Sequence, residues 1–149
     1  MFRRSTPFAI AAPLSSRLGA VFDAWTGLLR GEATIPFADD LDVVGLEGLC
    51  PNLFLLGVFE KPRRFRLDLA RTPDAPQIEG AFRGRFIDEV DMPTPMEFLR
   101  AQAEAAVESA AATVYDHVPA GAGRAYGRLV LPTWGEGQVS LLVGAVEFR

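Results

Sequence analysis

The pattern of apolar and polar positions predicts two strands that are buried on both faces. Residues 53–59 are apolar at nearly every position, and residues 139–148 carry apolar side chains on both alternating faces. A strand with this pattern occupies the centre of a sheet, because neither of its faces suits contact with water. The first and last strands are therefore expected to lie next to each other.

Two further segments alternate in the way of half-exposed edge strands. In residues 64–71 the apolar side chains Phe65, Leu67 and Leu69 share one face, and residues 113–118 alternate likewise. A fifth strand is expected over residues 126–132, followed by a hairpin connection at Trp134–Gly137. Two central and two edge strands predict an α+β fold with a five-stranded antiparallel sheet ordered 2-1-5-4-3, with helices on one face and an additional N-terminal helix.

The N-terminal helix is expected over residues 14–30, capped by Ser15 or Ser16 and ended by Gly31. Its apolar seam has the 4, 3, 4, 3 spacing of two heptads and consists of Leu14, Leu18, Val21, Trp25 and Leu28. This seam would either join two copies of the chain as a homodimer or pack on the chain's own sheet, and both alternatives stay open.

Two more helices are indicated between the strands. Residues 43–49 form a short one, and the sequence Thr94-Pro95-Met96-Glu97 has the form of a capping box with proline at the first helical position. The second helix then runs to about Ala111, with an apolar face rich in alanine. The segment between Thr72 and Pro95 is dense in proline and glycine, which fits short helical turns and loops.

Length and composition fit one globular domain of 149 residues, expected over residues 14–149 after a flexible tail of residues 1–13. A net charge of -4 without a basic run argues against nucleic acid as a partner. No apolar run approaches the ~20 residues that span a bilayer, so a cytoplasmic protein without a membrane partner is expected. One cysteine and one histidine exclude an internal disulfide and make a zinc site unexpected.

From about Leu18 to Glu147 the chain resembles a PAS domain, and more closely the small stand-alone PAS-like proteins of bacteria. The resemblance rests on Trp25 with Leu28-Leu29-Arg30, Pro36 with Asp39 and Asp42, Leu49-Cys50-Pro51-Asn52-Leu53-Phe54, Phe65-Arg66-Leu67, Leu131-Pro132 and Gly137. The chain differs at Arg71-Thr72, where such proteins tend to carry Gly-Thr. The resemblance implies sensing, ligand binding or protein association, commonly as dimers joined through an N-terminal helix.

In a fold of this kind, aromatic side chains would flank a cavity between sheet and helices, either lining it for a ligand or filling it as core. The candidate ligand-binding residues are Phe82, Phe86, Phe98, Tyr115, His117 and Tyr126, with Trp134 as a further aromatic. No cofactor is identified by the sequence. No cluster of ionisable groups is evident, so no catalytic residue is assigned.

Two single residues have a functional and a structural interpretation. His117 could ligate haem or act as a base, but a strand histidine that is exposed or hydrogen-bonded at a sheet edge is the preferred interpretation. Asp116 cannot pair with it directly, because neighbouring strand residues point to opposite faces. Cys50 could form a flavin adduct, although its flanking residues favour a buried structural thiol.

Arginines gather on the predicted hairpin and the segment after it. These arginines are Arg63, Arg64, Arg66, Arg71, Arg83 and Arg85. They could bind a phosphate or carboxylate ligand. We prefer the interpretation that their charges protect a sheet edge from pairing with other strands. Taken together, we expect a non-enzymatic PAS-like sensory or interaction module that signals through a partner protein. The alternatives are a sensor holding a small molecule or haem in its cavity, and a small hydrolase or isomerase on a related α+β fold.

Overall fold

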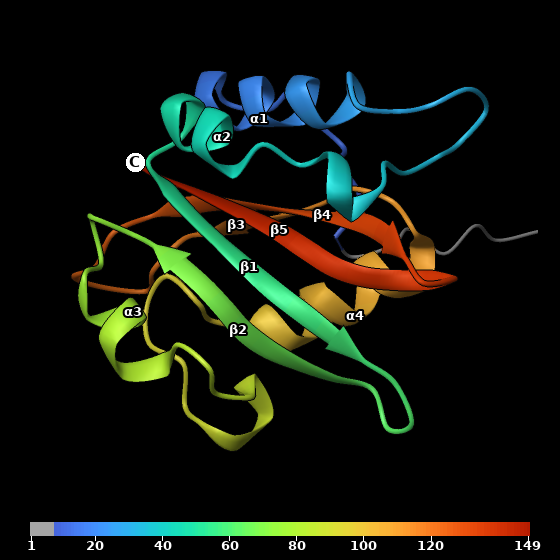
Figure 1. Cartoon of the computed structure of the whole chain (residues 1–149). Coiled ribbons are helices and arrows are strands. Elements are labelled where there is room, and N and C mark those ends of the chain that lie inside the picture. Colours follow the sequence, from blue (N-terminus) through green and yellow to red (C-terminus); the bar gives the residue numbers. More distant parts are fainter. Residues whose placement is uncertain (1–7) are drawn as a thin grey trace, which may run out of the picture.

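The computed structural model describes residues 8–149 and contains one antiparallel sheet of five strands (Figure 1). The strands are β1 (Asn52–Phe59), β2 (Arg64–Arg71), β3 (Thr113–His117), β4 (Tyr126–Gly135) and β5 (Gln138–Phe148). They lie in the order β2-β1-β5-β4-β3, which confirms the predicted order. The first and last strands pair directly, with Leu55 opposite Val143.

Helices cover both faces of this sheet, so the prediction of helices on one face was wrong. Figure 1 shows α1 (Ser16–Thr26) and α2 (Val43–Leu49) on one side, and α3 (Gln77–Phe82) and α4 (Leu99–Ser109) on the other. Two consecutive residues of β4 point to opposite faces and show which helix lies on each. On the face of Gly127, an added Cβ would lie 3.2 Å from Leu18 of α1. On the other face, Arg128 donates to Gln102 of α4. The physical reason lies in the central strands, which are apolar on both faces and therefore need cover on both.

The N-terminal helix packs on the chain's own sheet, which is one of the two alternatives that the sequence left open. Leu18, Val21 and Trp25 are buried, and the Trp25 indole N–H donates to the carbonyl of Pro132 at 2.9 Å. The helix is shorter than the expected 14–30, and the end positions Leu14 and Leu28 are half-buried. A dimer built on this seam would require α1 to leave the sheet.

The expected capping box does not begin a helix. Thr94 Oγ1 donates to Glu97 at 2.5 Å, but α4 starts only at Leu99, after Phe98 in the left-handed region at φ 59°. The peptide before Pro95 is cis. The carboxylate of Glu97 turns to the hydroxyl of Tyr126 on the sheet, so a sheet contact replaces the helical geometry.

A bulge in β2 changes the face of one predicted core residue. Leu67 pairs with Leu56 and Leu69 with Leu55, so Asp68 has no partner across the β1–β2 pair. Phe65 and Leu67 are buried as predicted, but after the bulge Ala70 takes the buried position and Leu69 is half-exposed. The alternation predicted for this strand therefore holds only up to residue 67.

Both sheet edges are partly covered by other segments of the chain. The Leu67 amide of β2 donates to Arg85 at 2.9 Å, and the Val114 amide of β3 donates to Phe8 at 2.8 Å. Such cover limits strand pairing with other molecules. Of the tail predicted over residues 1–13, residues 1–7 lie outside the described part, and residues 8–13 lead from the edge of β3, where Phe8 accepts from Val114, across to α1. None of the helices within residues 8–149 has both the length and the apolarity to cross a bilayer.

Candidate functional site

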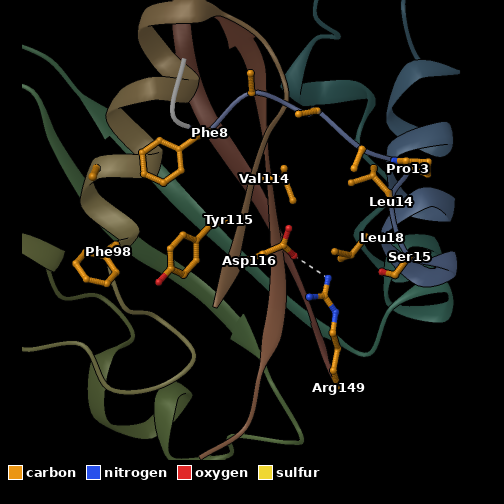
Figure 2. A pocket seen from close by; sticks show the side chains of 14 residues that line it. Phe8, Pro13, Leu14, Ser15, Leu18, Phe98, Val114, Tyr115, Asp116 and Arg149 are labelled. Carbon is orange, nitrogen blue, oxygen red and sulfur yellow. Dashed lines mark hydrogen bonds and ion pairs between the residues drawn. The ribbon is translucent and has the colours of Figure 1, made fainter. Parts of the chain in front are cut away.

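A cavity of about 600 Å³ opens at the outer edge of β3, and it is called the edge cavity below (Figure 2). One wall is the N-terminal segment 8–15 with Leu18 of α1, and the other is formed by Phe98, Ala101 and the strand residues Val114 and Tyr115. Its volume lies within the range of about 300–1,000 Å³ that is usual for small-molecule sites. The edge cavity therefore has the size of a ligand site.

The walls are mainly apolar, with one ion pair. Figure 2 shows Phe8, Phe98 and Tyr115 together on one side, with the centroids of Phe98 and Tyr115 5.8 Å apart. Asp116 and Arg149 form the ion pair, with 2.7 Å between their side chains. The edge cavity is therefore an apolar volume next to two charges, those of Asp116 and Arg149, that neutralise each other.

Tyr115 joins the edge cavity to a group of ionisable side chains behind it, named here the polar cluster: Glu97, Tyr115, His117, Tyr126 and Arg128. The Tyr115 hydroxyl lies 2.9 Å from Nδ1 of His117, whose ring stacks on Tyr126 with centroids 4.8 Å apart. Tyr126 donates to Glu97 at 2.7 Å, and His117 Nε2 lies 3.6 Å from the same carboxylate. These residues come from β3, β4 and the segment before α4, and the antiparallel pairing of β3 with β4 sets His117 opposite Tyr126.

Arg128 is the buried charge of the cluster. Its Nε donates to Gln102 at 2.7 Å and its Nη1 to the Pro95 carbonyl at 2.9 Å, while Nη2 makes no hydrogen bond within residues 8–149. Its guanidinium carbon lies 4.9 Å from the centroid of the Tyr115 ring. Burial lowers the pKa of Arg128 to about 10, against the opposing influence of the two tyrosines and Glu97, so the side chain stays charged at neutral pH.

Three other members of the polar cluster, Glu97, Tyr115 and Tyr126, have pKa values that are moved away from neutral pH. Burial raises the pKa of Tyr126, and its hydrogen bond to Glu97 raises it further. Burial also raises the pKa of Tyr115. For Glu97, burial acts upward but hydrogen bonds from Thr94 and Tyr126 outweigh it and lower the pKa. The carboxylate is therefore ionised and both phenols are neutral.

The structure divides the predicted ligand residues among different places. Tyr115, His117 and Tyr126 come together in the polar cluster, and Phe98 packs beside Tyr115 at the edge cavity. The remaining three lie elsewhere: Phe82 on α3, Phe86 under Arg64 near β2, and Trp134 at the β4–β5 hairpin. The predicted aromatics therefore do not line one cavity.

Glu97 and Arg128 were missed by sequence reasoning, which found no ionisable cluster. Arg128 could have been noticed, because it is a single charge in an otherwise apolar strand, and a charge there must be satisfied by partners. Glu97 was assigned to helix capping and gave no separate signal. The separation of Asp116 from His117 was predicted correctly, since Asp116 pairs with Arg149.

The remaining candidates have structural surroundings. Cys50 is buried, its thiol lies 3.3 Å from the Val146 carbonyl, and burial raises its pKa, as expected of a structural thiol. Five of the six candidate arginines have carboxylate neighbours, namely Glu60 for Arg63, Asp88 for Arg64, Asp68 for Arg66, Glu47 for Arg71 and Glu79 for Arg83. Within residues 8–149, no group of three or more His, Cys, Asp or Glu side chains is placed to hold a metal ion.

Comparisons of the chain with models of known protein families, with curated proteins and with solved structures find no match.

Proposed function

We propose that the protein is a non-enzymatic, PAS-like sensory module that binds a small, mainly apolar molecule in the edge cavity and signals through a partner protein. The sheet order supports the PAS-like assignment, because it is the order of the PAS-like fold that we expect for this chain, and the apolar pattern of the strands predicts the same order. The observation that carries the functional proposal is the edge cavity itself, with its apolar walls and ligand-sized volume.

The position of the edge cavity suits a sensor because one of its walls is the segment that leads into α1. A ligand there would contact residues 8–15 and β3 at once, and the hydrogen bond from Val114 to Phe8 ties these two walls together. Binding energy that differs between two arrangements of the segment would shift the population between them. Because Leu18, Val21 and Trp25 face the sheet, an output partner would contact the outward side of α1.

Tyr115 offers a second route by which ligand binding in the edge cavity would affect the rest of the sheet. Its ring lines the cavity, while its hydroxyl contacts His117 inside the polar cluster. A ligand that moves this ring would change the hydrogen bonding of His117 and the contact between the Tyr115 ring and Arg128. The signal would thus reach Arg128 near the start of β4.

The haem alternative is less well supported. Nδ1 of His117 is occupied by Tyr115, Nε2 faces Glu97 at 3.6 Å, and the ring is stacked on Tyr126. With Nδ1 held by Tyr115, the ligand to iron would have to be Nε2, so haem binding would displace Glu97 from its place beside this nitrogen.

The enzyme alternative is less well supported for a similar reason. A general acid or base works best with a pKa near the working pH. In the polar cluster the pKa values of Tyr115 and Tyr126 are raised and that of Glu97 is lowered, so all three are moved away from neutrality. These groups are suited to hydrogen bonding and positioning.

Titration with the uncharged fluorescent probe N-phenyl-1-naphthylamine tests the proposed ligand site. Ala101 lines the edge cavity on α4, and Ala81 is an exposed alanine on α3. We expect saturable binding with one probe per chain in the wild type and in Ala81→Trp, and loss of binding in Ala101→Trp because the indole fills the cavity. Equal binding by all three proteins, or no saturable binding by the wild type, would contradict the proposal.

A further inference from the structure

A second cavity, of about 570 Å³, lies where the β4–β5 hairpin meets residues 37–39, and it is called the hairpin cavity below. The residues that matter in its lining are Phe37, Asp39, Trp134 and Glu136. It shares no lining residue with the edge cavity. Its chemistry is therefore independent of the proposed ligand site.

Two aromatic side chains are held at the hairpin cavity by backbone pairing. Phe37 and Trp134 form a parallel β-bridge, and the Trp134 amide donates to the Pro36 carbonyl at 2.9 Å. Both side chains are nevertheless open to solvent, at 43% for Phe37 and 39% for Trp134. A fixed and exposed pair of large aromatic side chains is a feature of recognition sites.

The charges in the hairpin cavity are negative and uncompensated. Asp39 and Glu136 are both exposed, and neither forms an ion pair with a basic side chain of residues 8–149. Asp40 differs, since it pairs with Arg30 at 2.7 Å. That same Arg30 guanidinium lies 5.6 Å from the centroid of the Phe37 ring, so one face of this ring already attracts a cation of the chain.

We propose that the hairpin cavity binds an organic cation, an ammonium or guanidinium group, between the aromatic side chains and the carboxylates. Aromatic faces attract such cations through the ring quadrupole, and Trp is the strongest of these partners. The carboxylates add Coulomb attraction and discriminate against anions. Ser140 and the Gly135–Gly137 turn line the same cavity.

The experiment follows the indole N–H resonances of the full-length chain by NMR during titration with choline. The protein has two tryptophans, and Trp25 is buried with its N–H bound to Pro132, so its resonance serves as an internal control. The neutral analogue 3,3-dimethylbutan-1-ol has the same shape as choline and lacks its charge. Choline is added against sodium chloride of equal ionic strength.

We expect a saturable shift of the Trp134 resonance with choline, none with the neutral analogue, and a constant Trp25 resonance. The double variant Asp39→Asn/Glu136→Gln should bind choline about tenfold more weakly or worse, a loss of about 1.4 kcal/mol, because both charge contacts are removed and only the aromatic contacts remain. The matched control Asp23→Asn/Asp91→Asn removes two exposed charges elsewhere and should bind like the wild type.

A blocked Gly-Gly-Lys-Gly-Gly peptide distinguishes the two sources of the cation. If the peptide binds more tightly than choline, the cation is a basic side chain of a partner protein, and if choline binds as tightly or better, it is a free organic ammonium ion. Both results support the site. Three results would overturn the proposal: no saturable Trp134 shift with choline and none with the peptide, equal binding of the neutral analogue and choline, or undiminished choline binding by Asp39→Asn/Glu136→Gln. None of these results would bear on the edge cavity.

Discussion

The ring of Phe54 on β1 occupies the space next to Gly144 on β5, so closely that a Cβ at position 144 would lie 1.9 Å from Cζ of Phe54. The two residues are register partners in the two central strands. Gly144 is therefore required by a close approach, because its φ angle alone would permit a side chain. The contact links the first and last strands of the sheet at its centre.

Replacing Gly144 by alanine should destabilise the protein by about 1–3 kcal/mol or more, because the buried ring must move from its place. Urea unfolding of the variant measures this loss. Gly48→Ala is the matched control: it lies in α2 with open space around its Cβ position, and should change stability by less than about 1 kcal/mol, in the stabilising direction. Equal stability of Gly144→Ala and wild type would mean that this contact is not as tight as described.

Charge placed on the inner side of α1 should unfold the chain rather than separate two copies of it. Leu18 is 1% exposed, so Leu18→Asp buries a carboxylate without a partner and should cost about 3 kcal/mol or more. Arg17→Asp, on the exposed neighbour, should have a small effect. Circular dichroism and light scattering measure folding and mass. A folded Leu18→Asp protein with half the wild-type mass would instead support the homodimer seam.

The strand order could be predicted because it depends on a strong and local signal. The segments 53–59 and 139–148 are apolar on both faces, and the alternation of 64–71 and 113–118 places these at the edges. Helix cover on both faces followed from the same pattern but was not inferred. The start of α4 could not be predicted, because the interaction that decides it, from Tyr126 to Glu97, joins residues far apart in the sequence.

The edge cavity shows the same limit of sequence reasoning. Tyr115 and Phe98 were identified as aromatic residues near a cavity, but Phe8 belonged to a segment expected to be a tail. Phe8 is held at β3 by the backbone hydrogen bond from Val114 and by the packing of its ring on Tyr115, and the sequence has no pattern for either contact. The polar cluster depends likewise on the register of β3 and β4.

Replacing Gln102 should destabilise the protein strongly when Arg128 is present and less when Arg128 has also been replaced. Gln102→Leu leaves the Arg128 Nε without its acceptor, and it leaves the Arg128 carbonyl without the donor that Gln102 provides. Loss of partners around a buried charge should cost about 2–4 kcal/mol. The double variant Gln102→Leu/Arg128→Met removes the charge as well and should recover part of that loss. A double-mutant cycle by urea unfolding measures the coupling, and strictly additive effects would contradict it.

Stability should fall at alkaline pH because of Tyr126. Its pKa is raised in the folded state, so the folded chain keeps the phenol proton at a pH where the unfolded chain, with an ordinary tyrosine pKa of about 10, loses it. The stabilisation is complete below about pH 10 and is lost as pH rises above that value.

Tyr126→Phe should reduce the loss of unfolding free energy at alkaline pH. In the wild type, the tyrosinate absorbance band should show that Tyr126 ionises only as the protein unfolds. An equally steep decline in Tyr126→Phe would show that Tyr126 is not its source. Tyr115→Phe is the comparison: the pKa of Tyr115 is raised as well, but this tyrosine is less buried and does not bond to Glu97, so its removal should flatten the decline of stability less than Tyr126→Phe does.

The most direct test of the ligand site is native mass spectrometry of the protein after incubation with a small-molecule extract of the cells that produce it. Wild type and Ala81→Trp should both retain the same small molecule, one per chain, and Ala101→Trp should retain none, because its indole occupies the edge cavity. Retention of that molecule by Ala101→Trp, or its absence from wild type, would contradict the assignment of the edge cavity as the site of a sensed ligand.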